Sequence, residues 1–103
     1  MREPPRVYIA GPMTGLPEYN VPAFNEASES LRLTGHLPLN PARRGVNPSW
    51  TWLDYMRAAL RDIADADGVA FLDGWECSRG ANIEVGLARD LGIPANPLRW
   101  WLR

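Results

Sequence analysis

The chain has 103 residues, with eleven basic and twelve acidic side chains that give a formal net charge of −1. This balance supplies no attraction for duplex nucleic acid or an anionic membrane, so we expect neither as a partner. Hydrophobic residues at 46% and charged residues at 22% exclude a disordered or fibrous chain. We expect a single domain over residues 1–103, small enough that a homo-oligomer would support it.

A single cysteine, Cys77, excludes an internal disulfide and a thiolate zinc cage. The N-terminal stretch MREPPR lacks the long apolar run of a signal peptide or a membrane span. We therefore expect a cytoplasmic protein without a metal or other cofactor.

The first half of the chain predicts two strands separated by a helix. Residues 7–10 form a short apolar run closed by a Gly-Pro pair and predict a buried strand. The proline-rich loop over residues 12–22 is long enough to be a candidate for function. Apolar residues at helical spacing from Pro22 predict a helix that Gly35 ends, and residues 37–40 predict a weak edge strand.

The second half predicts two more helices and two more strands. Ser49 is expected to cap a helix whose apolar stripe reaches Ile63. Residues 68–72 form a continuous apolar run, as expected for a central parallel strand buried on both faces. A helix over residues 79–91 and a short last strand over residues 93–95 complete the pattern.

Strands that alternate with helices predict βαβ units and a parallel sheet with right-handed crossovers. We expect an α/β fold of three layers, α/β/α, similar to flavodoxin and Rossmann folds, with strand order 2-1-3-4. Ligands of such sheets bind beyond the carboxyl ends of the strands, where the winding direction switches. The loops over residues 11–15 and 73–80 should therefore meet at the ligand site.

Glu84 is the most informative side chain in this expected site. Its neighbours one helical turn away are Gly80, Ala81, Leu87 and Ala88, which places the carboxylate on the small, apolar, sheet-facing side. Burying an unpaired carboxylate costs several kcal/mol, so its presence points to a function. The alternative is a glutamate that reaches solvent or pairs with an arginine.

Two loops flank Glu84 in the expected topology. Residues 78–82 lead into the helix with small residues and free N–H groups that suit a phosphate, although Ser78 is also typical of an ordinary N-cap. The sequence Gly11-Pro12-Met13-Thr14-Gly15 can present N–H groups and a hydroxyl to a ligand, and it is equally typical of a simple turn. Without a GxGxxG or Walker A pattern, dinucleotide and P-loop chemistry have no support.

The histidine and the tryptophans are assigned from their positions along the chain. His36 precedes the edge strand, so we expect it to face solvent rather than act in catalysis. Trp52 is expected in the core and Trp75 at the wall of the ligand cleft. Trp100 and Trp101 are expected to form a subunit contact.

Four segments cover nearly the whole chain: YIAGPMTGLPEYNVPAFNEA, LPLNPA, LDYMRAAL and DGVAFLDGWECSRGANIEVGLARDLGIP. In this combination they resemble the small nucleoside 2-deoxyribosyltransferase-like proteins of bacteria and their phages. The resemblance is to members of the type labelled DUF4406, which are related to the nucleotide N-glycosidases.

The resemblance implies a reaction and a substrate. In such enzymes a glutamate on the last helix attacks C1′ of a 2′-deoxyribosyl group and releases the base, and Glu84 matches this nucleophile. Water or another base then resolves the covalent intermediate, which gives a hydrolase or a transferase. Nucleotide N-glycosidases carry a serine six residues before the glutamate to receive a 5′-phosphate, and Ser78 matches it. The resemblance also implies an oligomer, because relatives complete the pocket from a neighbouring subunit.

The chain departs from the family at a second carboxylate. Family enzymes carry it on the preceding helix to help protonate the leaving base, and the matching residue here is Ala59. Asp62 and Asp73 are candidate replacements. Because losing a general acid lowers rates by roughly 10²- to 10⁴-fold, whether the chain is an active enzyme is left open.

The expected catalytic residues are therefore Glu84, with Asp62 or Asp73, and the expected ligand is a small nucleoside or nucleotide. The alternatives are a weak or inactive nucleotide-binding module and a purely structural oligomer. The expected substrate-binding residues are Tyr8, Gly11, Met13, Thr14, Gly15, Trp75, Ser78, Gly80 and Ala81.

Overall fold

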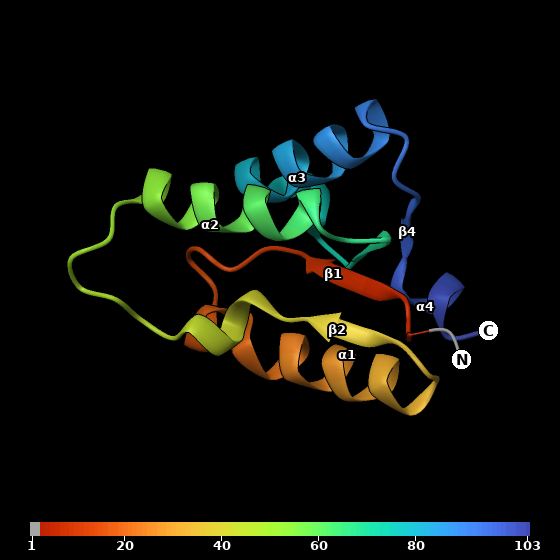
Figure 1. The fold of residues 1–103 in the computed structure, drawn as a ribbon. Helices are drawn as coiled ribbons and strands as arrows, with labels where there is room; N and C mark the ends of the chain where they lie inside the picture. The colour runs from red at the N-terminus through yellow and green to blue at the C-terminus, as the bar shows by residue number, and fades with distance from the viewer. Residues whose placement is uncertain (1–2) are drawn as a thin grey trace.

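A computed structural model describes residues 3–103. The fold is built on a four-stranded parallel sheet in the order β2-β1-β3-β4 (Figure 1). The predicted α/β class and strand order are confirmed. The strands are β1 (Arg6–Ala10), β2 (Leu37–Leu39), β3 (Gly68–Phe71) and β4 (Ala95–Pro97).

Helices cover both faces of the sheet (Figure 1). Helix α1 (Val21–Leu33) packs on one face together with the short α4 (Leu98–Trp101), whereas α2 (Trp52–Ala64) and α3 (Arg79–Asp90) pack on the other. Alternation along β1 explains both layers, because Tyr8 joins the core beneath α2 and α3 while Ile9 joins the core beneath α1.

The first and third strands bring their following loops together at one edge of the sheet. Tyr8 is in register with Val69, and the N–H of Leu72 donates to the carbonyl of Ala10 at 2.8 Å. Gly11 lies so close to the end of β3 that a Cβ on it would be 3.0 Å from Cβ of Leu72. The edge at which these two strands end is the switch point where the sequence predicts a ligand site.

Helix α2 begins two residues later than predicted. Thr51, not Ser49, is its N-cap: the Thr51 hydroxyl accepts from the N–H of Asp54, and the Asp54 carboxylate accepts from the N–H of Thr51. A capping box needs an acidic or amide side chain three residues after the cap, which Thr51 has and Ser49 lacks. Ser49 instead donates to the Asn47 side chain at 2.9 Å.

The last strand is also displaced from its predicted position, residues 93–95, to Ala95–Pro97. The end of α3 uses the intervening residues: Gly92 has φ 78°, and the N–H of Ile93 donates to the carbonyl of Ala88 at 2.8 Å. These are the features of a Schellman motif, which occupies Ile93 before the chain can extend into a strand.

Three aromatic residues lie elsewhere than predicted. Trp101 packs into the chain's own core and donates its Nε1–H to the carbonyl of Val69 at 3.0 Å, so it is not a free contact surface. Trp100, by contrast, is 41% exposed and so remains accessible for the predicted subunit contact. Trp52 is also 41% exposed and therefore not in the core. His36 is half-buried with its ring edge-on to Trp101, rather than fully facing solvent.

Gly68 should be required for this packing. A Cβ on Gly68 would lie 2.6 Å from Cζ2 of Trp101, so Gly68→Ala is expected to lower the free energy of unfolding by about 1–3 kcal/mol. Gly86→Ala is a matched control, because nothing lies within 4 Å of its Cβ and alanine favours the interior of α3. Urea unfolding of both variants tests this, and equal stabilities would contradict it.

None of the helices described for residues 3–103 has the length and apolar character needed to cross a membrane.

Candidate active site

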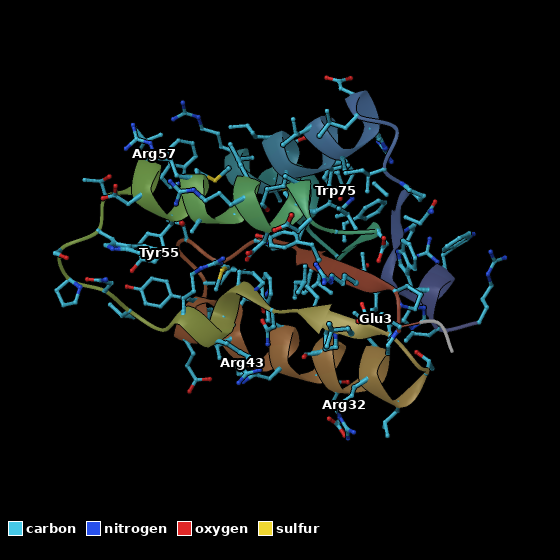
Figure 2. All side chains as sticks on the ribbon, viewed as in Figure 1. Glu3, Arg32, Arg43, Tyr55, Arg57 and Trp75 are labelled. Carbon is cyan, nitrogen blue, oxygen red and sulfur yellow. The ribbon has the colours of Figure 1, made fainter. Side chains whose placement is uncertain are left out.

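A cleft of about 800 Å³ opens at the carboxyl edge of the sheet. Its walls come from the segments that follow β1, β2 and β3, and from one side of α2. Figure 2 shows Tyr55 pointing from α2 into the space between that helix and the chain that follows β2. The cleft therefore occupies the switch point, as the topology predicts.

Glu84 lies on the wall of this cleft and is only 7% exposed. The Tyr8 hydroxyl donates to its Oε2 at 2.6 Å, a buried hydrogen bond between β1 and α3. Both side chains face each other because Tyr8 points from the sheet toward α3 and Glu84 points from α3 toward the sheet. Glu84 therefore neither faces solvent nor pairs directly with an arginine, which were the two alternatives that the sequence left open.

Burial raises the pKa of Glu84 to about 7, while the hydrogen bond from Tyr8 and the positive charge of Arg44 act in the opposite direction. Burial also raises the pKa of the Tyr8 hydroxyl well above its usual value, and the charge of Glu84 adds to the effect. Tyr8 therefore remains the proton donor in this pair, and Glu84 changes charge near neutral pH.

Removing the Tyr8 hydroxyl should move this titration to higher pH. Tyr8→Phe deletes a hydrogen bond that favours the Glu84 carboxylate, so its pKa should rise above about 7. Following the Glu84 carboxyl by NMR through a pH titration measures the shift. Tyr55→Phe is the control, because the Tyr55 hydroxyl bonds to Asn47 instead. An unchanged midpoint in Tyr8→Phe would contradict the coupling.

The N-terminus of α3 forms a second wall of the cleft. Ser78 caps the helix, and its Oγ accepts from the N–H of Ala81 at 3.2 Å. The Asn82 side chain donates to the carbonyls of Glu76 and Ser78 at 2.9 and 2.8 Å, which ties the preceding turn to the helix. The cap uses Ser78 only as an acceptor, so its hydroxyl proton remains available to a ligand.

The structure brings most of the predicted site residues together. Those that line the cleft are Tyr8, Gly11, Met13, Thr14, Ser78, Gly80, Ala81 and Glu84. The residues that do not line it are Gly15, Asp62, Asp73 and Trp75.

The positions of the predicted residues that do not line the cleft have physical reasons. Trp75 packs against Phe71 with ring centroids 4.8 Å apart, because Gly74 at φ 85° turns the chain back over β3. Asp73 lies in the same turn, beside a smaller hollow that Trp75 also lines. Gly15, at φ 83°, is an ordinary turn residue. The prediction that Trp75 walls the cleft is therefore wrong.

Asp62 is paired with Arg44 and does not line the cleft. The guanidinium of Arg44 also donates to the carbonyl of Ala58 at 3.3 Å, so it lies along α2. Ala59, where the sequence resemblance implies a second carboxylate, is buried and contributes only a methyl group to the cleft.

Several cleft residues were not predicted. Arg44 and Tyr55 come from segments after β2, where the same rule that predicted the other loops applies, because the carboxyl ends of parallel strands share one edge. Tyr19 lies in a left-handed turn with φ 53°, and Asn20 fixes this turn by donating to the carbonyl of Pro12 at 3.0 Å. No periodicity in the sequence signals such a turn.

Within residues 3–103, no three His, Cys, Asp or Glu side chains gather in a way that would hold a metal ion.

The sequence model of the domain of unknown function DUF4406 matches residues 5–96. The chain belongs to this family. The DUF4406 chain is also similar in fold to a 2-deoxyribosyltransferase from the psychrotolerant bacterium Bacillus psychrosaccharolyticus, with a TM-score of 0.69 and 22% sequence identity. The similarity covers 87% of this chain and 69% of that enzyme. No curated protein matches the chain. The expected membership of DUF4406 is thus confirmed, and the likeness to a deoxyribosyltransferase is confirmed at the level of the fold.

Proposed function

We propose that this DUF4406 chain cleaves the base–sugar bond of 2′-deoxynucleoside 5′-monophosphates, with Glu84 as the nucleophile. Water or a second base would accept the deoxyribosyl group. The observation that carries the proposal is the buried carboxylate of Glu84, which accepts a hydrogen bond from Tyr8 and lies on the wall of a cleft at the switch point.

The cleft and its chemistry support a nucleotide ligand. A cleft of about 800 Å³ lies within the range of small-molecule sites, and its lining is mostly apolar and aromatic with a few polar groups. The fold is that of an enzyme named as a deoxyribosyltransferase. The bond from Tyr8 uses Oε2 of Glu84 and leaves Oε1 to attack C1′.

The proposed reaction is a retaining double displacement. Ionised Glu84 forms an ester with C1′ as the base leaves, and water or a new base then attacks C1′ from the opposite side and frees the carboxylate. Because the nucleophile must be charged, kcat/KM is expected to rise with pH through an apparent pKa near 7.

Ser78 is proposed to receive the 5′-phosphate with the N–H groups at the start of α3. Ser78→Asp retains a capping side chain but places a negative charge against the phosphate, so it should weaken binding of deoxynucleoside monophosphates by roughly 10-fold or more while sparing nucleosides. Calorimetric titration with both ligands tests this. Ser49→Asp, outside the cleft, is the control. An unchanged preference for nucleotide over nucleoside would sink the phosphate assignment.

The enzyme proposal is tested by incubating the protein with deoxynucleoside 5′-monophosphates and measuring free base by chromatography. The rival function, a nucleotide-binding module without turnover, is favoured by one observation, the methyl group of Ala59 where the resemblance to deoxyribosyltransferase-like enzymes implies a carboxylate. Thermal stabilisation by nucleotides without base release would select the binding module.

A homo-oligomer is also part of the proposal. The exposed Trp100 ring, stacked under Arg103 at 4.7 Å, is available for a subunit contact, whereas Trp101 is not. Light scattering measures the mass in solution, and a monomer at all concentrations would contradict assembly.

A further inference from the structure

Arg44 lies on the cleft wall and has no role in the function proposed so far. Arg44 ends the 3₁₀ turn Pro41–Arg44 that follows β2, and Gly45 at φ 67° turns the chain away after it. Its side chain lines the cleft and is 25% exposed. Its guanidinium has five N–H donors, and the ion pair with Asp62 and the bond to the Ala58 carbonyl both use Nη2.

These two contacts place the Arg44 guanidinium beside Ala59 on the cleft wall. Ala58 and Asp62 are one turn apart on α2, and Ala59 lies between them on the cleft side. Arg44 therefore lies along α2 next to Ala59, where the cleft wall has only a methyl group. Arg44 and Glu84 line the same cleft, and the positive charge of Arg44 opposes the rise that burial causes in the pKa of Glu84.

Among the described residues, Glu84 is the only carboxylate on the cleft. Asp62 is held by Arg44 outside the lining, and the single histidine is not part of it. The other cation of the lining, Arg79, is exposed and lies over the Trp52 ring, 4.5 Å from its centroid. Within the described part of the chain, the cleft thus offers positive charge near Glu84 but no second carboxylic acid that could protonate a leaving base.

We infer that Arg44 stabilises the departing base as an anion, so that the chain prefers nucleotides whose bases leave as stable anions over those whose bases must first gain a proton. This rests on the proposed function. Oxo-pyrimidines such as uracil belong to the first class, and cytosine, whose anion is much less stable, belongs to the second.

The step balances without an acid. The Oε1–C1′ bond forms as the C1′–N bond breaks, the bonding pair stays on the base nitrogen, and the N–H donors of Arg44 bind the negative base. Water supplies the proton after departure. A guanidinium keeps its own protons at neutral pH, so it can bind the anion but cannot protonate it. Asp62 is a positioning residue, because it holds the guanidinium against α2.

The test uses deoxyuridine 5′-monophosphates with hydrogen, methyl, fluorine or bromine at C5, which change the acidity of the leaving base with little change in shape. The unaltered protein should cleave the more acidic bases faster. Arg44→Gln should lower kcat by roughly 10²- to 10³-fold for uracil, the loss typical of one charged donor, and by less for the more acidic fluorouracil. The loss should be the same with nucleoside substrates.

Arg43→Gln is the matched control, because it removes the same charge from an exposed neighbour outside the cleft. Asp62→Asn keeps the cation and should give a smaller, equally base-dependent loss. Equal losses for every base, or a loss confined to nucleotides, would overturn the role of Arg44 while base release still supports Glu84. No base release by the unaltered protein would overturn the proposed function and this inference together.

Discussion

Replacing Glu84 by glutamine is expected to lower base release from deoxynucleoside monophosphates by roughly 10⁴-fold or more, because no other described side chain of the cleft can form the ester with C1′. Glutamine has nearly the same shape and can still accept the hydrogen bond from Tyr8. Binding of the nucleotide should therefore persist while turnover is lost. Single-turnover chromatography and calorimetry measure the two effects separately.

Glu76→Gln is the control for this experiment, since Glu76 is an exposed carboxylate in the turn before α3 and does not line the cleft. Its rate should equal that of the unaltered protein. If Glu84→Gln released base at the unaltered rate, the nucleophile assignment would be wrong.

The same substitution should stabilise the fold, increasingly so as the pH rises from about 4.5 to 7. Burial raises the pKa of Glu84 from 4.5 to about 7, so the folded protein binds this proton more tightly than the unfolded chain does. The neutral carboxyl therefore contributes its full stability below about pH 4.5, and the contribution is lost as the pH rises through 7. Glu84→Gln avoids this loss, which amounts to about 3 kcal/mol for a shift of this size.

Urea unfolding at pH 5 and pH 8 measures the difference. Glu84→Gln should exceed the unaltered protein by about 3 kcal/mol at pH 8 and by roughly 2 kcal/mol less at pH 5, whereas Glu76→Gln should show no such trend. A stability difference that does not change with pH would show that Glu84 is not held in a desolvated position.

The buried Glu84 carboxylate lowers the stability of the fold at neutral pH, which points to a functional role for this side chain. A carboxylate whose pKa lies near neutrality is partly ionised and weakly solvated, and both properties favour attack on an electrophilic carbon. The stability that the protein loses at Glu84 is therefore consistent with a site selected for chemistry.

The parts of the molecule that depend on periodicity were predictable from the sequence. Alternation along residues 7–10 and the helical spacing around Glu84 determine which faces meet, so the contact between β1 and α3 follows from the pattern. The strand order follows from alternating strands and helices, and with it the location of the cleft.

The parts that depend on tertiary contacts of loops were not predictable in this way. Trp75 turns toward Phe71 because of the left-handed Gly74, and the sequence does not reveal which way such a turn directs the ring. Arg44 reaches the cleft only because Ala58 and Asp62 hold its guanidinium along α2. By contrast, the displaced cap of α2 was readable, because Thr51 and Asp54 have the spacing of a capping box.

The most direct test of the central claim is to look for the covalent intermediate. The protein is mixed with 5-fluoro-2′-deoxyuridine 5′-monophosphate, quenched in acid at short times, and analysed by intact mass and peptide mapping. The prediction is an added deoxyribose 5-phosphate group on the peptide that contains Glu84, absent in Glu84→Gln. Rapid base release with the added group on another residue would contradict the assignment of Glu84 as the nucleophile.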